Sequence, residues 1–469
     1  MKSWAIPDGE RWPFWLLVAF LILTVMIGGS SRADIASLVI LRPVALLTCG
    51  LALVTLRREH IAEHKLLLGG LVAAVGLCVL HLVPLPYDVW SALPGRQIMV
   101  DIDAAAGLGQ SARPLSMVPA STWNALFSLS VPAAVLLLGV QLPPRQLTHL
   151  LPIIIGLGLL TAVVGLIQAL GPSRGPFYFY RITNYGAAVG LFANRNHQAL
   201  FLASLLPMIA SWASYQGHSQ EKGRTRLAIA AAMAIYIVPL ILVTGSRAGA
   251  VLAFVGLVLG YFCYRRPIGV ATAERKTRRS YLSWLVGGVA LIGGAMMGVV
   301  LSTTEAIERI ISSDQMEDQR LLVWQPIIEL CRAYFPFGSG IGSFVQAYQI
   351  NEPDALLSTK YLNHAHNDLL EIVMTAGLPG LVLVVAALCV IAGRAAAAWR
   401  LPIRSQSPLS LVRLASGLVA MMVFSSLVDY PLRVPSITAI FSVVLLWLAG
   451  DTRHVRNGSQ SDKRSSVAS

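Results

Sequence analysis

The chain has 469 residues, of which 55% are hydrophobic and 13% are charged, and its formal net charge is +13. Soluble domains carry about a quarter charged residues, so this composition excludes a string of soluble domains and predicts one polytopic integral membrane protein. The basic residues lie in loops between apolar segments, where membrane topology and contact with lipid headgroups explain them and nucleic acid is not an expected partner.

The apolar segments predict an all-α fold, a membrane bundle of about twelve transmembrane helices, because each span needs about 20 mostly apolar residues. The first is interpreted as a retained span, since no small-residue cleavage site follows it. The expected helices are 12–29, 35–55, 66–84, 121–140, 147–170, 197–215, 227–244, 249–264, 281–301, 370–398, 409–429 and 436–450.

The distribution of Lys and Arg predicts the orientation. With both termini in the cytoplasm, 23 of these residues fall on the cytoplasmic side and 12 on the outer side, as the positive-inside rule expects. Residues 1–301 are predicted to form nine helices, with an outer loop at 85–120. A large, partly helical outer loop (302–368), three further helices (369–450) and a disordered cytoplasmic tail (451–469) follow.

A polar segment, His-Ala-His-Asn-Asp at 364–368, leads directly into the tenth expected helix. We expect that helix to begin at Asp368, which can cap its own first turn with Glu371, and to break at Gly377. His366 then lies just outside a helix N-terminus, where free backbone N–H groups favour anions and disfavour an imidazolium. A neutral His366 there can accept a proton.

Two arginines are further candidates at the outer side. Arg247 lies in the short turn 245–249, Gly-Ser-Arg-Ala-Gly, close to the membrane surface. An arginine at that depth is costly unless paired, so a functional role is favoured over snorkelling to headgroups. Arg320 is expected to open the helix of the large loop, where by itself it would be an ordinary solvated charge.

Two other polar groups lie at predicted outer edges. Arg195 and Asn196 open the sixth expected helix, where such residues serve either as caps or as substrate contacts. Asp429 and Arg433 flank a proline turn, and for such a pair a structural role is favoured.

No metal or cofactor is predicted. The two histidines of the polar segment lack a third ligand at useful spacing, and the spacing of Asp101 and Asp103 arises often by chance. The five cysteines show no CxxC spacing and predict neither zinc nor disulfides. Arg42 and His81, inside apolar segments, are left unassigned.

These residues together resemble the bacterial O-antigen ligase and polysaccharide polymerase family. Its ligases carry a His followed by Asn, Ser or Gln, then nine residues, a Gly, two residues, and Gly, Thr or Tyr. His366-Asn367, Gly377 and Gly380 satisfy this motif at every position. The 245–249 turn is similar to the family's conserved-arginine turn.

The large loop extends the resemblance, since Arg320 with Trp324 and the run 336–340 is similar to the family's periplasmic loop. The resemblance covers roughly residues 180–435. It implies a multi-pass protein of the bacterial inner membrane that transfers a glycan from undecaprenyl diphosphate to an acceptor hydroxyl at the periplasmic face, without a metal. The acceptor would be a lipid A core sugar, a second lipid-linked glycan or a protein, so ligase and polymerase stay open.

The resemblance implies that Arg247 and Arg320 stabilise the diphosphate leaving group and that His366 is the general base. Other residues near the same face are expected to bind substrate, and they are His364, Asn367, Arg195, Asn196, Asp429 and Arg433.

Two other functions stay open at this point. A helical bundle with membrane-embedded arginines is also compatible with a transporter, or flippase, of a lipid-linked saccharide. Paired broken helices are typical of transporters and are not evident here, and the polar residues gather on one face. A non-catalytic assembly protein of the same family is disfavoured by the intact His and Arg positions.

Overall fold

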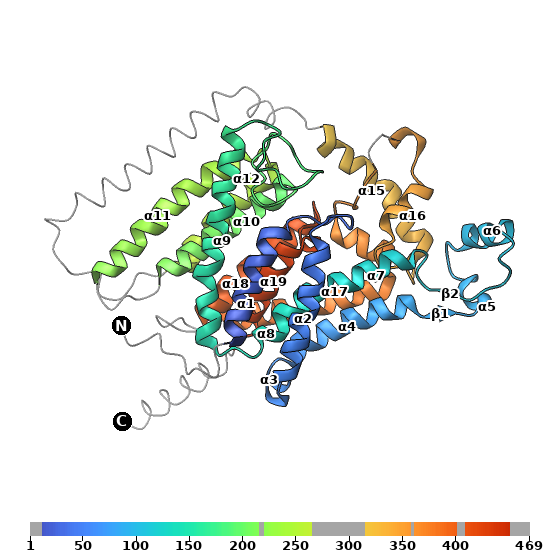
Figure 1. Cartoon of the computed structure of the whole chain (residues 1–469), viewed down its shortest axis with the longest axis horizontal. Coiled ribbons are helices and arrows are strands. Elements are labelled where there is room, and N and C mark those ends of the chain that lie inside the picture. The colour runs from blue at the N-terminus through green and yellow to red at the C-terminus, as the bar shows by residue number, and fades with distance from the viewer. Residues whose placement is uncertain (1–11, 215–219, 265–314, 358–360, 401–408, 451–469) are drawn as a thin grey trace.

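The computed structural model describes residues 12–214, 220–264, 315–357, 361–400 and 409–450, and this part is almost entirely helical (Figure 1). The predicted all-α membrane bundle is confirmed. The expected helix 281–301, residues 302–314 of the large loop and the tail 451–469 lie outside the described residues.

The predicted spans in the described part are all present, with ends shifted by a few residues. The expected helix 121–140 forms two helices joined at Leu129, α7 (Pro119–Ser128) and α8 (Ser130–Gly139). The others are α1 (Trp12–Ile27), α2 (Leu38–Thr55), α4 (Lys65–Leu82), α9 (Pro144–Leu170), α10 (Arg195–Ala213), α11 (Gln220–Val243), α12 (Arg247–Cys263), α17 (Asp368–Arg400), α18 (Leu409–Ser426) and α19 (Pro435–Leu448).

Several short elements connect these helices. Strand β1 (Pro84–Leu85) pairs antiparallel with β2 (Arg113–Pro114), and this hairpin extends with α5 and α6 beyond the rest of the molecule (Figure 1). The remaining elements are α3 (Arg58–Glu63), α5 (Tyr87–Trp90), α6 (Gln97–Ala105), α15 (Gln315–Tyr334), α16 (Phe344–Ile350) and the 3₁₀ turns η2 (Asp354–Leu356) and η3 (Pro431–Arg433).

Six helical segments of the described part are long and apolar enough to cross a membrane, with α7 and α8 counted together. Helices α1, α12, α18 and α19 are apolar but shorter. Helix α10 differs from all of these because nearly every one of its side chains is buried. It packs against α9, α11, α12 and α18, so it forms the centre of the bundle.

Small residues let α10 and α12 approach closely. A Cβ added to Gly249 would lie 2.4 Å from the Cβ of Ala199, and one added to Gly256 would lie 2.6 Å from the carbonyl oxygen of Ala203. Close backbone contact at small residues is a common way for membrane helices to associate. Because the contacts advance together along both helices, α10 and α12 run parallel and begin at the same end of the bundle.

Hydrogen bonds between distant segments gather the predicted outer loops at one end. The amide of Ala193 donates to the carbonyl of Gly29 over 2.9 Å, and the amide of Met117 donates to the carbonyl of Ser339 over 2.9 Å. At the opposite end the indole of Trp447 donates to the carbonyl of Leu147 over 2.8 Å. The loops therefore lie in two groups, one at each end of the bundle, as expected when successive helices run in opposite directions.

The start of α17 is broken and supported by the large loop. Gly377 has φ 60° and ψ −150°, so the predicted break at this residue is confirmed. The amide of Leu378 donates to the carbonyl of Pro336 over 2.7 Å, and the amide of Gly340 donates to Thr375 over 2.9 Å. A Cβ on Gly377 would lie 2.1 Å from the Pro336 oxygen, so only glycine fits.

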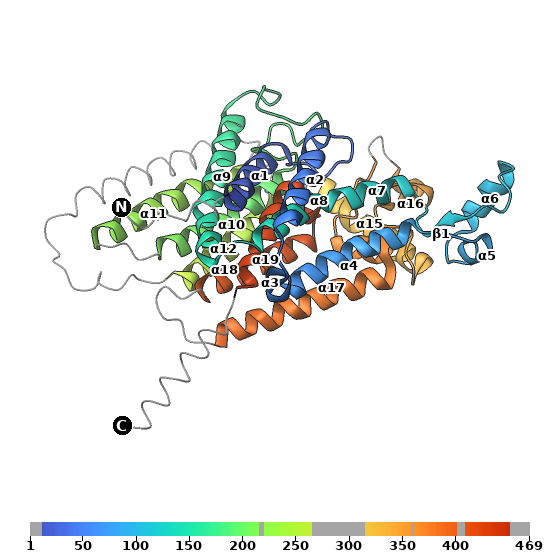
Figure 2. The ribbon, with the colours of Figure 1, turned by 60° about the horizontal axis from the view of Figure 1, so that its bottom comes forward.

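The helices of the large loop form a second, smaller core over this break. Helix α15 packs on α17, and the long α17 runs beside α4 (Figure 2). The expectation that Arg320 opens the loop helix is wrong, since α15 begins at Gln315. The buried apolar residues of this second core are Val323, Ile327, Leu330, Cys331, Tyr334, Phe344, Ala347, Tyr348, Ala365 and Met374.

Candidate functional site

His366 has an unusual backbone conformation. Its φ is 50°, which makes it the one non-glycine residue with positive φ in the described ranges. The left-handed region is sparsely populated by residues with a Cβ, and its strain concentrates at functional positions. Asn367 follows, and its Oδ1 accepts hydrogen bonds from the amides of Leu369 and Leu370, each over 3.1 Å. Asn367 thus caps α17, and the expectation that Asp368 caps it with Glu371 is wrong.

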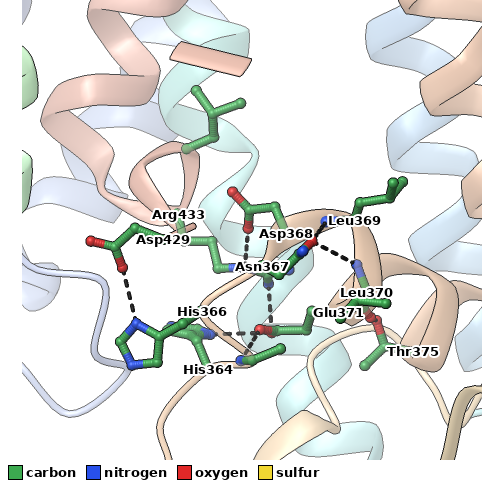
Figure 3. A network of polar contacts seen from close by, with 12 residues as sticks. His364, His366, Asn367, Asp368, Leu369, Leu370, Glu371, Thr375, Asp429 and Arg433 are labelled. Atoms are coloured by element: carbon green, nitrogen blue, oxygen red, sulfur yellow. Dashed lines mark hydrogen bonds and ion pairs between the residues drawn. The ribbon is translucent and has the colours of Figure 1, made fainter. Parts of the chain in front are cut away.

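The ring of His366 is held by Asp429. The Nδ1 atom of His366 lies 3.1 Å from Oδ1 of Asp429 (Figure 3). An ionised carboxylate only accepts hydrogen bonds, so a neutral His366 ring that donates from Nδ1 to Asp429 has its lone pair on Nε2. The Asp429 side chain is 3% exposed and that of His366 is 16% exposed. The carboxylate is therefore shielded from water while the imidazole still reaches the surface.

The other oxygen of Asp429 is contacted from α10. The amide Nδ2 of Asn196 donates to Oδ2 of Asp429 over 3.1 Å, and Nε2 of His197 lies 3.7 Å from the same oxygen. Asn194 fixes this end of α10 by accepting a hydrogen bond from the amide of Asn196 over 2.9 Å. The central helix of the bundle thus sets the position of the carboxylate that orients His366.

Tyr430 fills the space between three imidazoles. Its ring centroid lies 4.3 Å from that of His364, 4.9 Å from that of His366 and 5.3 Å from that of His197. Packing of this kind restricts ring rotation, so the conformation of the His366 side chain is limited by an aromatic contact as well as by a hydrogen bond.

Glu371 ties the polar segment to the start of α17. Its Oε2 accepts a hydrogen bond from the amide of Ala365 over 2.9 Å, and its Oε1 lies 3.1 Å from Nδ1 of His364. The same Oε1 lies 3.1 Å from Nη1 of Arg433. With the Glu371 side chain 2% exposed, these partners replace the water that the carboxylate has lost.

Arg433 joins two carboxylates of α17. Its Nε donates to Oδ1 of Asp368 over 2.9 Å, in addition to its contact with Glu371 (Figure 3). Burial alone would lower the pKa of Arg433, but the two carboxylates outweigh it and raise this pKa above its ordinary value. The guanidinium therefore stays charged, and the turn η3 is fastened to the helix that follows His366.

The predicted arginines lie at the same end of the bundle or in the loop above it. Arg247 is the first residue of α12, directly after Ser246, whose Oγ accepts a hydrogen bond from the amide of Gly249 over 2.9 Å. The parallel packing of α10 and α12 puts Arg247 at the end where Asn196 contacts Asp429. Arg320 lies within α15, and its side chain is outside the described part of the structure.

Six of the nine predicted site residues meet around η3, and they are His364, His366, Asn367, Asn196, Asp429 and Arg433. Arg195 begins α10 next to them, and its amide donates to Oδ1 of Asn184 over 3.0 Å. Sequence reasoning missed His197 and Tyr430 as members of this cluster. Each is adjacent in sequence to a predicted residue within a polar segment. A single sequence does not show which distant segments come into contact.

The polar residues left unassigned have structural partners. Arg42 donates to the side chains of Asn124 and Ser128, which crosslinks α2 and α7. His81 accepts a hydrogen bond from the amide of Ile341 over 3.2 Å. In the first outer loop Asp103 pairs with Arg113, and Asp101 accepts from Gln97. No group of three or more potential metal-binding side chains converges in the part of the chain that was described.

Comparison with known proteins supports the resemblance. The sequence model of a family described as O-antigen ligase matches residues 231–385, about a third of the chain. A search of curated proteins gave no significant match. The matched segment contains Arg247, Arg320 and His366, while Asn196 and Asp429 lie outside it. Resemblance to the O-antigen ligase family is thus confirmed, and the contacts around His366 extend beyond the matched segment.

Proposed function

We propose that this chain, whose residues 231–385 match the O-antigen ligase family, transfers a glycan from undecaprenyl diphosphate to an acceptor hydroxyl. The reaction would take place at the periplasmic face of the bacterial inner membrane. The observation that supports this most strongly is the pair His366–Asp429, whose 3.1 Å contact leaves Nε2 of the imidazole as a proton acceptor.

His366 would act as the general base. As the acceptor oxygen attacks the anomeric carbon, its proton passes to Nε2 of His366, and the bond from that carbon to the diphosphate breaks. Asp429 stabilises the imidazolium that forms, as a carboxylate does when it accepts the Nδ1 hydrogen bond. Proton transfer by a positioned side chain contributes about 10²–10⁴-fold to a rate. Attack opposite the leaving group predicts inversion at the anomeric carbon.

Arg247 and Arg320 would stabilise the charge that develops on the departing diphosphate. Guanidinium groups bind such oxygens through two parallel hydrogen bonds, which lysine cannot reproduce. The position of Arg247 at the first residue of α12 adds the free backbone donors of a helix N-terminus, which also favour phosphate. With this charge stabilised by arginines, the proposed reaction needs no metal ion.

The remaining predicted residues receive more specific roles. Asn196 and Arg433 would position the centre, since the amide of Asn196 is bonded to Asp429 and the guanidinium of Arg433 to Asp368 and Glu371. Asn367 would act through the helix that it caps. Arg195 stays a candidate substrate contact at the start of α10.

A reconstituted transfer reaction tests the proposal. The purified chain in lipid nanodiscs is incubated with a synthetic undecaprenyl-diphosphate glycan and either a lipid A core acceptor or a second lipid-linked glycan, in the presence of EDTA. We expect a new glycosidic bond of inverted configuration and release of undecaprenyl diphosphate. The acceptor that reacts separates ligase from polymerase.

A vesicle experiment separates the proposal from transport. If the reconstituted chain moves labelled donor across vesicles and forms no glycosidic bond with any acceptor, the transporter interpretation replaces the proposed transfer. In cells, loss of glycan on the core would indicate a ligase, and loss of chain length with single units retained would indicate a polymerase.

A further inference from the structure

A cavity of about 380 Å³ lies between two loops at the end of the bundle that carries His366. Arg32 and residues 34–37, after α1, form one wall, and residues 179–182, before α10, form the other. We propose that this cavity is a glycan subsite, which binds a sugar ring of the donor or of the acceptor next to the reacting centre. This inference rests on the proposed transfer function for the identity of its ligand.

The polar part of the cavity is a preorganised ion pair. Arg32 binds Asp34 through two parallel hydrogen bonds, Nε to Oδ1 over 2.9 Å and Nη2 to Oδ2 over 3.0 Å. Asp34 is about half exposed, and Nη2 of Arg181 lies 4.0 Å from its Oδ2. The exposed carboxylate edge accepts hydrogen bonds and the arginines donate them. Neighbouring hydroxyl groups of a sugar, which both donate and accept, fit such a pair.

The apolar part of the cavity is aromatic. Phe179 lines it with 55% of its surface exposed, and Phe177 in the same loop is 42% exposed. A flat apolar ring next to fixed polar groups is the usual composition of a small-ligand site, and the C–H face of a sugar can pack on it. Exposed aromatic residues also occur where a protein meets the membrane interface, so the experiment below must separate the two roles.

The cavity adjoins the centre around His366. The guanidinium of Arg32 lies 5.3 Å from the ring centroid of Tyr361, which precedes His364 by three residues. On the other side the amide of Gly29 donates to the hydroxyl of Tyr180 over 2.7 Å, and the amide of Ala193 donates to the carbonyl of Gly29 over 2.9 Å. Residue 193 leads directly into α10. The two loops of the cavity are thus joined by direct contacts to both segments that position His366.

Equilibrium binding of lipid-free sugars tests the subsite. The full chain in nanodiscs is titrated by calorimetry with two probes: the repeat-unit oligosaccharide released from the lipid-linked donor by mild acid, and the core oligosaccharide freed of lipid A. We expect one probe to bind, and Phe179→Ala and Asp34→Asn each to weaken its binding about 10-fold, as loss of one stacking or hydrogen-bonding contact of about 1.4 kcal/mol does. The probe that binds identifies donor or acceptor.

Two controls make the outcome interpretable. Trp15→Ala removes an equally exposed aromatic residue, 59% exposed, near the opposite end of α1 and should leave the binding constant unchanged. Thermal unfolding in the same nanodiscs reports whether each variant is folded. If neither probe binds, or if Phe179→Ala leaves binding unchanged, the subsite proposal is overturned. A lower unfolding midpoint of Phe179→Ala with unchanged binding would indicate that Phe179 is an interfacial anchor.

Transfer assays separate this proposal from the one on which it rests. We expect Phe179→Ala to raise KM for the glycan that binds there about 10-fold while kcat changes less than twofold, since the reacting atoms are untouched. Sugar binding that depends on Phe179 without any transfer by the wild-type chain would remove the proposed enzyme function alone. Normal KM in Phe179→Ala and Asp34→Asn, in a chain that transfers glycan, would remove the subsite alone.

Discussion

Arg413 and Arg394, at one end of the bundle, have different partners from Arg433 at the other. At the end where α17 finishes, Arg413 donates to the backbone carbonyls of Ala398 and Trp399, and Arg394 donates to that of Ala449. These are the last carbonyls of α17 and α19, which lack partners within their helices. At the other end Arg433 binds two carboxylates instead, and histidines and an aspartate stand beside it.

The difference distinguishes arginines that cap helix ends from an arginine that belongs to a cluster of charged side chains. A cation at a helix C-terminus satisfies free carbonyls and the helix dipole, and needs nothing more to explain it. Buried carboxylates that bind imidazoles add little to the stability of the fold, because the cost of removing the charges from water cancels much of their attraction. Under the proposed function, the pairs around His366 hold the imidazole in the orientation that proton transfer needs.

Among the residues that act through another side chain, the largest effect should come from Asp429→Asn. The amide can present its NH₂ to Nδ1 of His366 and favour the tautomer that has no lone pair on Nε2. We expect kcat for transfer to fall about 10²–10³-fold, which is the scale of a lost general base, with little change in KM. Initial rates with purified protein measure this.

Asp354→Asn is the matched control, because Asp354 is exposed in η2 on the surface of the large loop. Its rate should stay within twofold of wild type. An Asp429→Asn variant that unfolds at the wild-type temperature and transfers at the wild-type rate would show that Asp429 does not orient the base.

Glu371→Gln should affect stability and rate together. The amide leaves Arg433 with one carboxylate and weakens the hold on the backbone of Ala365, so the turn carrying His366 loosens. We expect the free energy of unfolding to fall by about 2 kcal/mol, below the 3–5 kcal/mol typical when a fully buried pair loses a partner, because Asp368 still pairs with Arg433. The rate should fall about 10-fold, as for other residues that orient a reactive group through a second side chain.

Thermal unfolding and initial rates, measured on the same preparations, test this prediction against Glu329→Gln. Glu329 is an exposed glutamate of α15 that accepts a hydrogen bond from Gln325, so its substitution should change neither quantity appreciably. Equal behaviour of the two variants would contradict a role for Glu371 in holding the turn.

The smallest effect should come from the opposite end of the bundle. Arg413→Ala removes hydrogen bonds to two carbonyls and the stacking of the guanidinium on Trp399, whose ring centroid lies 4.9 Å away. We expect a loss of about 1 kcal/mol in unfolding free energy, typical of a lost cap, and a transfer rate within twofold of wild type. A 10-fold loss of transfer rate at unchanged stability would contradict this distinction, because an arginine at the end far from His366 would then be needed for transfer.

Local patterns predicted the helices and their breaks well. Gly377 marks the break in α17 because no other residue tolerates its φ of 60° against the Pro336 carbonyl, and this is visible in the spacing Gly377-Leu-Pro379-Gly380. The cap of the same helix was misassigned, because Asn367 and Asp368 are both good cap residues and only the backbone conformation of His366 decides between them.

The long-range contacts of the site could not be predicted from the sequence. Asp429 was expected to pair with Arg433 across the proline turn, whereas it contacts His366 and Asn196, and Arg433 turns to Asp368 and Glu371. Opposite charge alone does not choose among these alternative pairs, so the choice depends on how α10, α17 and η3 pack. Periodicity predicts the faces of helices but not this packing.

The most direct test of the central claim is the single-turnover rate of His366→Ala with saturating donor and acceptor, in protein whose thermal unfolding matches wild type. If the imidazole held by Asp429 removes the acceptor proton, this rate falls at least about 100-fold, while binding of the lipid-linked donor is retained. A rate within threefold of wild type in the folded variant would contradict the account, because the acceptor would then lose its proton to some other group.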